Sequence, residues 1–363
     1  SGVEARYAQV ALDGAGNAIA VWRQDGPDGD DTDDIRAARY DVDSGAWTAP
    51  TTIEQLDDFP SRPELAMNAA GHAVAVWTQV DGSGFDGVRA NHYTPGNGWF
   101  ANARSIEAMN TTAGSPTIAM DGDGNAIAVW SQPDTVGTDP DIRANRYNVA
   151  SEAWNSGAMR IENSAGAGAE FPEIAMNRSG RAMVVWIHDD GTRDNVRANQ
   201  YLPGLGWSFP SIAIEQRNSN ALAPDVAIGP DGHTVAAWVQ NGDSVPDADI
   251  RSNRYVVGSG WGVRAYVIEE VSAALSGVVE VGIDDDGDAI AVWTLNDGGH
   301  DSLWANRADT GRAWGVAQLL ESEDPDDVDR PALAVMPGGD AIAVWQQNNQ
   351  PQDSIFAARF NKE

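Results

Sequence analysis

Four acidic residues occupy the same position in a motif that recurs along the 363-residue chain. Glu64, Glu173, Asp225 and Glu280 each lie at the start of a short apolar strand, upstream of an Ala-Val-Trp-like string. If the repeats close into a ring, the four carboxylates meet at the mouth of its channel. Carboxylates that lie close together raise one another's pKa or bind a cation. The sequence therefore predicts a metal site at these four residues.

A second candidate site lies where two late repeats depart from a polar pattern. Leu295 replaces the Gln that usually follows the repeated Trp, and Trp304 and Phe356 replace an Arg. Aromatic side chains offer flat apolar faces to sugars and act as anchors for partner proteins. We predict a ligand-binding patch of Trp304, Phe356, Leu295 and His300. The alternative is that these side chains pack beneath a loop or at the closure of the ring.

The remaining repeats keep polar residues at the corresponding positions. An Arg lies in the third string of each unit and a Glu at its end, as in Arg36 with Glu54 and Arg143 with Glu162. We interpret these as a ladder in which Arg pairs with Glu and bonds to the Gln that follows the Trp. Such a ladder would hold each unit together and carry no activity.

Two turns, 121–125 and 284–288, resemble the start of a calcium loop with oxygen ligands. An EF-hand loop needs Glu at its twelfth position, and that position holds Gln132 or Leu295. We interpret both segments as hairpin turns. Calcium is the one cofactor for which the sequence leaves a place, at the four acids above or in the acidic loops.

Catalytic motifs are poorly represented. The five His are scattered over four repeats, and neither a His-Glu-x-x-His metal motif nor a Gly-x-Ser-x-Gly nucleophile elbow occurs. Acidic pairs are numerous, but nothing singles out two carboxylates as a glycosidase dyad. The sequence favours a protein without catalysis and leaves a glycan-active hydrolase or lyase as an alternative.

The repeats themselves predict the fold. The first repeated Trp recurs seven times, at intervals of 52 to 56 residues: Trp22, Trp77, Trp130, Trp186, Trp238, Trp293 and Trp345. An Ile-Arg-Ala-Asn-Arg-Tyr string follows, and then a second Trp and an Ile-Glu pair. Of the 14 Trp, only Trp304 lies outside the two repeated Trp positions. Each unit therefore reads as four short strands.

Seven four-stranded units are typical of a seven-bladed β-propeller. The strand 18–22 is apolar on both faces, as expected for a sheet covered on both sides. We predict an all-β fold and one domain over residues 1–363. The units span about 8–62, 63–115, 116–171, 172–223, 224–278, 279–330 and 331–363 plus 1–7. The last blade lacks its fourth strand, so it is either incomplete or closed by the N-terminal segment.

The charge restricts the possible partners. There are 54 acidic and 23 basic residues, giving a net charge of −31, which argues against nucleic acid and against anionic membrane surfaces. Our assignment places most acids in the loops of one face, the top face, with the densest loops at 25–34 and 321–329. The sequence contains no run of 18 apolar residues, so it does not predict insertion into a membrane. The chain contains no Cys, and it opens without Met, so we expect a mature or excised segment.

The unit resembles an uncharacterised family of secreted or surface-displayed bacterial repeat proteins. The shared strings are a Gly-Asn-Ala-x-Ala-Val-Trp strand, Ala-Asn-Arg-Tyr and Gly-Trp, seen here at Gly124–Trp130, Ala144–Tyr147 and Gly98–Trp99. The resemblance implies a propeller-like fold outside the cell and no particular reaction. The architecture is also similar to sialidase-type and lectin propellers, although the Ser-x-Asp-x-Gly-x-x-Trp box is not present.

These observations predict a non-catalytic extracellular binding module that recognises a glycan or a protein on its acidic top face. We expect it to form part of a larger surface protein or assembly. One alternative is a structural or adhesive repeat segment stabilised by calcium. The other is a glycan-active hydrolase or lyase.

Overall fold

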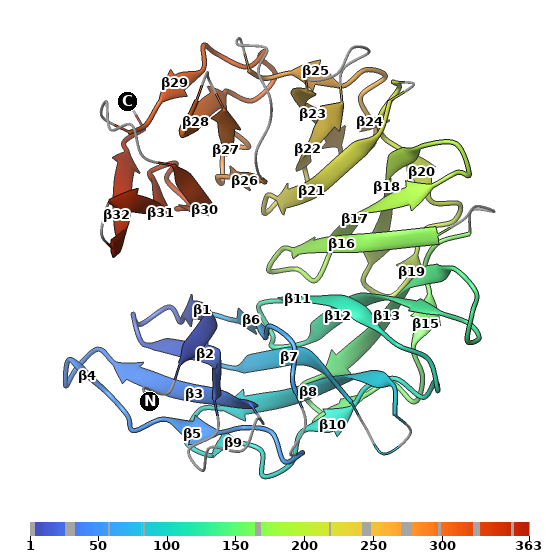
Figure 1. Ribbon diagram of the computed structural model, residues 1–363, viewed down its shortest axis with the longest axis vertical. Coiled ribbons are helices and arrows are strands. Elements are labelled where there is room, and N and C mark those ends of the chain that lie inside the picture. The colour runs from blue at the N-terminus through green and yellow to red at the C-terminus, as the bar shows by residue number, and fades with distance from the viewer. Residues whose placement is uncertain are drawn as a thin grey trace. The chain divides into compact units, whose positions relative to one another are not determined.

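The computed structural model describes residues 4–25, 33–56, 59–80, 82, 84–163, 168–217, 219–241, 248–269, 278–296, 299–321, 327–349 and 352–362. All regular elements in these ranges are β-strands (Figure 1). The ranges contain no helix long and apolar enough to cross a membrane.

Three long strands recur in each unit. The first strands are β1 (Ala5–Leu12), β6 (Glu64–Met67), β11 (Gly114–Met120), β16 (Gly168–Met176), β21 (Ala221–Ile228), β26 (Val279–Ile283) and β30 (Val328–Val335). The second strands are β2 (Ala18–Asp25), β7 (Ala73–Val80), β12 (Ala126–Pro133), β17 (Ala182–Asp189), β22 (Thr234–Asn241), β27 (Ala289–Asn296) and β31 (Ala341–Asn349). The third strands are β3 (Asp33–Asp41), β8 (Asp86–Thr94), β13 (Pro140–Asn148), β18 (Asp194–Leu202), β23 (Ala248–Val256), β28 (Asp301–Ala308) and β32 (Gln352–Phe360).

The fourth strand is divided into two short pieces that both pair with the third strand, as β14 and β15 pair with β13. The pieces are β4 (Ala46–Trp47) and β5 (Thr51–Thr52), β9 (Gly98–Trp99) and β10 (Arg104–Ser105), β14 (Ala153–Trp154) and β15 (Met159–Arg160), β19 (Gly206–Trp207) and β20 (Ile212–Ala213), and β24 (Gly260–Trp261) and β25 (Tyr266–Val267). In the sixth unit only β29 (Gln318–Leu319) forms. That unit therefore has no strand at its second Trp.

The antiparallel register between second and third strands is the same from unit to unit. Trp22 lies opposite Arg36, Trp130 opposite Arg143, and Trp238 opposite Arg251. Because side chains alternate between the two faces of a strand, this register places equivalent residues of each unit in equivalent surroundings.

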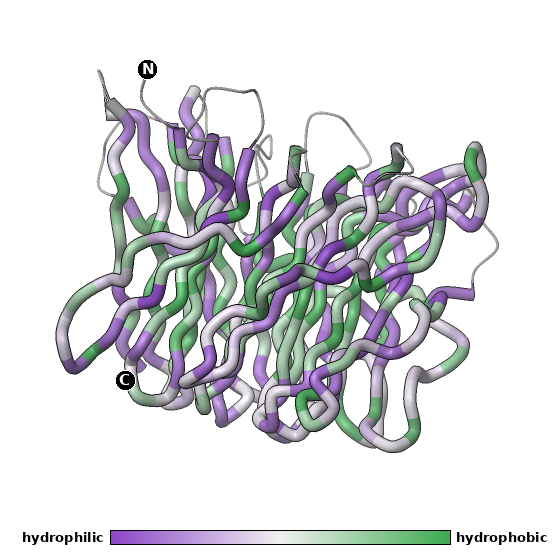
Figure 2. The backbone as a smooth tube through the Cα atoms, turned by 90° about the horizontal axis from the view of Figure 1, so that it is seen from below, coloured by the Kyte–Doolittle hydropathy of each residue, from purple (hydrophilic) through white to green (hydrophobic). Residues whose placement is uncertain are grey.

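The core consists of the apolar second strands and their neighbours. Five of the repeated Trp side chains are 0% exposed: Trp77, Trp130, Trp186, Trp238 and Trp293. The Ile that ends the unit is also buried and donates its N–H to the third strand, as in Ile53 to Ile35 O and Ile161 to Ile142 O, both at 2.9 Å. Figure 2 shows how apolar and polar stretches alternate along the chain. Both faces are buried in β7, β12, β17, β22 and β27, whereas in β2, which contains the strand 18–22, Trp22 is half-buried.

The first strands share an irregularity that the sequence did not indicate. The register with the second strand shifts within β1, β11, β21 and β30. Near each shift a residue other than Gly has a positive φ: Tyr7, Ser115, Ala223 and Arg330, with Phe171 in β16. β-Bulges of this kind bend a strand and redirect its side chains.

The segment 121–125 forms a hairpin turn, as interpreted from the sequence. Asp121 Oδ1 accepts from the backbone N–H groups of Asp123 and Asn125 at 3.0 and 2.8 Å. The turn needs Gly124, whose φ is +95°. The carboxylate of Asp121 is thus used within its own turn.

The seventh sheet contains three strands, in the order β30-β31-β32. Residues from Ala5 onward belong to β1, which pairs with β2 through Ala5 and Gln24. The N-terminal segment, where it is described, therefore completes the first sheet rather than the last. Of the two alternatives for the last blade, the incomplete blade is the one observed.

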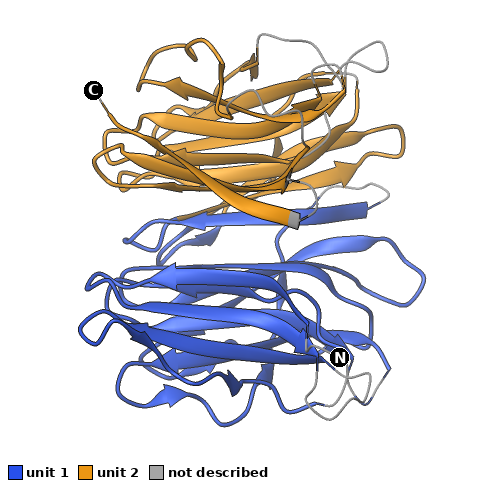
Figure 3. Cartoon of the chain, turned by 60° about the vertical axis from the view of Figure 1, so that its left-hand side comes forward, with its two compact units in different colours: residues 1–181, 202–207 blue, residues 182–201, 208–363 orange. Residues whose placement is uncertain are grey.

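The chain divides into two compact units, Ser1–Arg181 with Leu202–Trp207, and Ala182–Tyr201 with Ser208–Glu363 (Figure 3). We call them unit 1 and unit 2. Unit 1 contains the first three sheets, and unit 2 contains the last three. The aromatic pocket described below lies within unit 2. The assignment of residues 1–363 to one domain stays a prediction.

Candidate ligand-binding site

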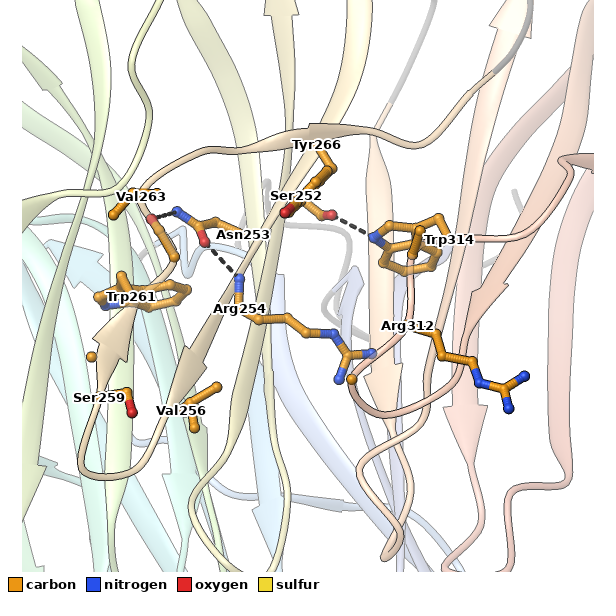
Figure 4. A pocket seen from close by; sticks show the side chains of 14 residues that line it. Ser252, Asn253, Arg254, Val256, Ser259, Trp261, Val263, Tyr266, Arg312 and Trp314 are labelled. Carbon is orange, nitrogen blue, oxygen red and sulfur yellow. Dashed lines mark hydrogen bonds between the residues drawn. The ribbon is translucent and has the colours of Figure 1, made fainter.

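Unit 2 contains a cavity of about 450 Å³ between its fifth and sixth sheets. One wall comes from β23 and from the turn that leads through β24 to β25, and the other comes from residues 311–314. Figure 4 shows Trp261, Tyr266 and Trp314 around it, with Arg254 and Arg312 below. We call this cavity the aromatic pocket.

The aromatic pocket arises where the repeat changes. In four other repeats the second Trp packs against the Tyr of the third strand, with ring centroids 5.5 to 5.8 Å apart: Tyr40–Trp47, Tyr93–Trp99, Tyr147–Trp154 and Tyr255–Trp261. In the sixth of the seven repeats, Ala308 replaces this Tyr. Trp314 instead extends to the neighbouring sheet, where its Nε1 donates to Ser252 Oγ at 2.6 Å.

Ser252 is itself a departure from the repeat. The equivalent residue is Ala in the other six repeats, for example Ala37 and Ala144. Its hydroxyl is buried and provides the acceptor that a methyl group lacks. Two substitutions that are separate in the sequence, Ser252 and Ala308, therefore act together to position Trp314.

The polar side chains around the aromatic pocket are engaged with the protein. Arg254 donates from Nη1 to Gly287 O at 2.7 Å and from Nη2 to Ala308 O at 3.2 Å, and burial lowers the pKa of this guanidinium. Asn253 donates from Nδ2 to Ile214 O at 2.9 Å and to Gly262 O at 3.0 Å. These bonds hold the wall of the pocket in place.

The chemistry of the aromatic pocket suits binding. None of the residues that line it is Asp, Glu or His, so the lining offers neither a carboxylate nor an imidazole. It offers aromatic faces, and Tyr266 is 62% exposed. A ligand with a flat apolar face fits such a surface.

The four residues predicted to bind a ligand do not form one patch. Leu295 is only 1% exposed and belongs to a core cluster that includes Trp293, against which Trp304 packs half-buried. Phe356 is half-buried in a different cluster and stacks on Trp345, with centroids 6.1 Å apart. Leu295 therefore has no surface to offer a ligand.

His300 is exposed at the end of the sixth unit's second hairpin. Its Nδ1 lies 3.9 Å from Asp327 Oδ1. A ligand-binding role for Trp304, Phe356 and His300 stays a prediction.

Two of the four predicted metal-binding acids lie in unit 1 and two lie in unit 2. In unit 1, Glu64 pairs with Arg62 at 2.6 Å and accepts from Gln9 Nε2 at 3.5 Å, while Glu173 accepts from Thr117 Oγ1 at 3.3 Å. Each acid is thus linked to the first strand of the preceding sheet. Burial raises the pKa of Glu64.

In unit 2, Asp225 Oδ2 accepts from the N–H of Val281 at 2.6 Å, next to Glu280. Burial raises the pKa of Asp225 to about 6. Within the described ranges, no three His, Cys, Asp or Glu side chains gather so that they could hold a metal ion. The cation site at Glu64, Glu173, Asp225 and Glu280 stays a prediction.

The other acidic candidates are partly outside the described residues. In the loops 25–34 and 321–329, residues 26–32 and 322–326 lie outside them. In the turn 284–288, the carboxylates of Asp284, Asp286 and Asp288 lie 2.7, 2.9 and 2.9 Å from Nζ of Lys362. This turn therefore uses its charge to bind the single lysine of the chain.

In the second and third sheets, Gln makes a polar contact with the Glu that ends the preceding repeat. Trp77 Nε1 donates to Gln79 Oε1 at 3.0 Å, and Gln79 Nε2 donates to Glu54 of the preceding sheet at 3.2 Å. We call this arrangement the Gln clasp. The third sheet repeats it with Gln132 and Glu107, 3.3 Å apart.

The third-strand Arg pairs with Asp residues instead. Arg251 Nη2 lies 2.6 Å from Asp249 Oδ2, and Arg143 pairs with Asp134. Where the clasp Gln is replaced, by His188 or Leu295, the buried Nε1 of Trp186 or Trp293 has no hydrogen-bond partner. The clasp thus accounts for the repeated Gln.

Neither a protein-family model nor a curated protein matches this sequence. Solved structures do match. The polysaccharide lyase Uly1 is 9% identical with a TM-score of 0.60, covering 94% of this chain and 87% of the lyase. The β-propeller domain of the Trilobed protease from Pyrococcus furiosus, described as having an open velcro topology, is 9% identical with a TM-score of 0.56, covering 98% and 94%. The intramolecular trans-sialidase from Ruminococcus gnavus is 12% identical with a TM-score of 0.53, covering 99% and 94%.

At these identities the similarity concerns the fold. Seven small antiparallel sheets and these neighbours define the protein as a seven-bladed, all-β propeller, which confirms the predicted fold class. Its architecture is similar to that of the sialidase propellers, as predicted.

Proposed function

We propose that this protein binds a glycan in the aromatic pocket. The observation that carries the proposal is the approach of Trp261, Tyr266 and Trp314 around one cavity of about 450 Å³. Ligand pockets are typically of this size, with aromatic walls and a few polar groups that fix orientation. Sugars present flat C–H faces that pack well on such rings.

The structural neighbours support a glycan-related role. A polysaccharide lyase and an intramolecular trans-sialidase are among the propellers similar to this chain. The aromatic pocket contains no carboxylate, and glycoside hydrolysis typically needs a pair of them, so we favour binding over the alternative of a hydrolase at this site.

The proposal differs in place from the sequence-based expectation. Residues 256–262 and 311–314 belong to connections between third and fourth strands, whereas the acidic top face was assigned to the other loops. Recognition of a partner by the top face remains a separate hypothesis. We further propose an extracellular location, in a larger surface assembly, on the basis of the family resemblance.

A glycan array tests the proposal with purified wild-type protein and three single variants. Trp261→Ala and Trp314→Ala each remove a wall of the aromatic pocket, and we expect each to lose the wild-type signals. Trp47→Ala is the matched control, because it removes an equivalent Trp from the first sheet, where it is 51% exposed. We expect Trp47→Ala to bind as the wild type does.

A fourth variant distinguishes the two candidate patches. Trp304→Ala should keep the wild-type signals if the aromatic pocket is the site. Binding that survives Trp261→Ala and Trp314→Ala but disappears in Trp304→Ala would refute the proposal. Circular dichroism and thermal melts establish that each variant is folded.

A further inference from the structure

We infer that the ligand of the aromatic pocket is an uncharged glycan, held mainly by contact between its C–H faces and the aromatic rings. This inference rests on the proposed glycan binding and adds the class of glycan. It follows from the way in which the pocket's own charges and hydrogen-bonding groups are already used.

Arg254 is the inner cation of the aromatic pocket. Both of its Nη atoms donate to backbone carbonyls, those of Gly287 and Ala308, at 2.7 and 3.2 Å. These two bonds hold the guanidinium against the backbone of the sixth sheet, and the carboxylates of Asp288 and Asp284 already act on its positive charge. Buried polar groups left without partners are costly, so Arg254 acts as a structural group.

Arg312 is the outer cation. Its side chain is 78% exposed, and its Nη1 lies 3.4 Å from Asp309 Oδ2 in the same turn. A cation in this position is well solvated and partly neutralised, so it attracts an anion only weakly. Neither guanidinium is therefore placed to recognise a negative charge.

Two of the neutral polar side chains are also occupied. Asn253 donates to Ile214 O and Gly262 O, and its Oδ1 accepts from the N–H of Arg254 at 2.8 Å. Ser252 Oγ accepts from Trp314. The lining residues Tyr266 and Ser259 carry uncharged hydroxyl groups suited to the hydroxyls of a sugar, and the aromatic faces supply the remaining contact.

The charge of the whole protein acts in the same direction. A net charge of −31 repels anionic polymers at low ionic strength. An uncharged chain of sugars meets no such barrier. Its binding should also be insensitive to salt, because screening acts only between charges.

The experiment compares charged and uncharged glycans on one array and then follows the strongest hits in solution. The array contains neutral, sialylated, sulfated and uronate glycans. The affinity of each hit is measured by isothermal titration calorimetry at 50 and 500 mM NaCl, for the wild type, Arg312→Ala and Trp314→Ala.

We expect neutral glycans as hits, with affinities that change less than about twofold between the two salt concentrations. Arg312→Ala should leave the preference for neutral over anionic glycans and the insensitivity to salt unchanged, whereas Trp314→Ala should lose about tenfold or more in affinity.

Two outcomes would overturn the inference, and they are distinguishable. Hits confined to anionic glycans, weakened by salt and by Arg312→Ala but still lost in Trp314→Ala, would reject the uncharged class and keep the proposed pocket. Binding of no glycan, or equal binding by Trp314→Ala, would reject the proposed function together with the inference.

Discussion

The first and second sheets and the fifth and sixth sheets are built from the same repeat but present different cavities. Between the first and second sheets lies a cavity of about 620 Å³, lined by Asp13, Arg39, Tyr93 and the turn 95–98. Arg39 and this turn correspond in the repeat to Arg254 and residues 311–313 of the aromatic pocket. The two cavities therefore occupy related places, one polar and the other aromatic.

One position accounts for much of the difference. In the second sheet Tyr93 lines the cavity, and Trp99 packs edge-on against it, with centroids 5.7 Å apart. In the sixth sheet Ala308 leaves Trp314 without such a ring, and Trp314 crosses to Ser252. The comparison teaches that the repeated residues hold the sheets together, while the departures from the repeat create the site.

The same two regions differ in the Gln clasp. Gln79 connects Trp77 and Glu54 between the first two sheets. Leu295 takes its place in the sixth sheet, so Trp293 Nε1 stays unpaired, and burial raises the pKa of Glu269 to about 7. The region that contains the aromatic pocket therefore lacks the hydrogen bonds of the Gln clasp.

Removing the clasp where it is present should have the largest effect. Gln79→Leu removes the acceptor of the Trp77 indole N–H and one donor each to the Glu54 carboxylate and the Leu56 carbonyl, while Glu54 keeps the N–H of Leu56. We expect a loss of about 3 kcal/mol in the free energy of unfolding, since each buried unsatisfied group costs about 1–3 kcal/mol. Urea denaturation measures it. The exposed substitution Gln318→Leu serves as the control. If Gln79→Leu lowered the free energy of unfolding by no more than this control does, Gln79 would not stabilise the fold through the Gln clasp.

The pH dependence of stability should depend on Glu269. Its pKa of about 7 in the folded protein exceeds the value of about 4.3 for an unfolded chain. The folded state therefore holds a proton that the unfolded state releases, and stability decreases as the pH rises from about 4.5 to 7. Glu269→Gln should be about 2 kcal/mol more stable than the wild type at pH 8, and its free energy of unfolding should vary less with pH over this range. Thermal melts of both proteins between pH 5 and 8 measure this difference. If the stability of the two proteins changed with pH in the same way, Glu269 would not be the cause of the pH dependence.

Restoring the repeated Tyr should close the aromatic pocket. In Ala308→Tyr, the new ring competes with Ser252 for Trp314, and we expect glycan affinity to fall about tenfold, or about 1.4 kcal/mol. Because Ala308 is buried, the folded state of this variant is checked by circular dichroism. Ser252→Ala provides a milder test through the loss of one hydrogen bond. Unchanged affinity in both variants would break the proposed connection between these positions and the site.

Installing the clasp where it is missing should have the smallest effect. Leu295→Gln offers Trp293 Nε1 an acceptor, as Gln79 does for Trp77. We expect a gain of about 1 kcal/mol in the free energy of unfolding and unchanged glycan binding. A thermal melt and a binding titration measure these quantities. A destabilised variant would mean that the sixth sheet is adapted to Leu295.

The sequence predicted the seven units, their strands and their buried Trp residues because each unit repeats the same alternation of side chains. It failed at Leu295, which was expected on a surface because Gln occupies that position elsewhere. Gln79, Gln132 and Gln240 are themselves 0% exposed. A polar residue can be fully buried when its hydrogen bonds are satisfied, so residue type alone did not reveal exposure.

The aromatic pocket was missed although its signals were present. Ser252 in place of Ala, and Ala308 in place of Tyr, are visible in a comparison of the units. Nothing in their order along the chain shows that Trp314 lies beside Ser252, 62 residues earlier. That neighbour relation exists only once the fifth and sixth sheets pack together.

The sequence by itself determined the blade, because local alternation, turn residues and apolar content act within some fifty residues. The tertiary structure decided which side chains of adjacent blades meet, which guanidinium groups are occupied and which Trp faces a cavity. These are contacts between segments distant in the chain, and they depend on packing geometry, which a pattern of residue types does not contain.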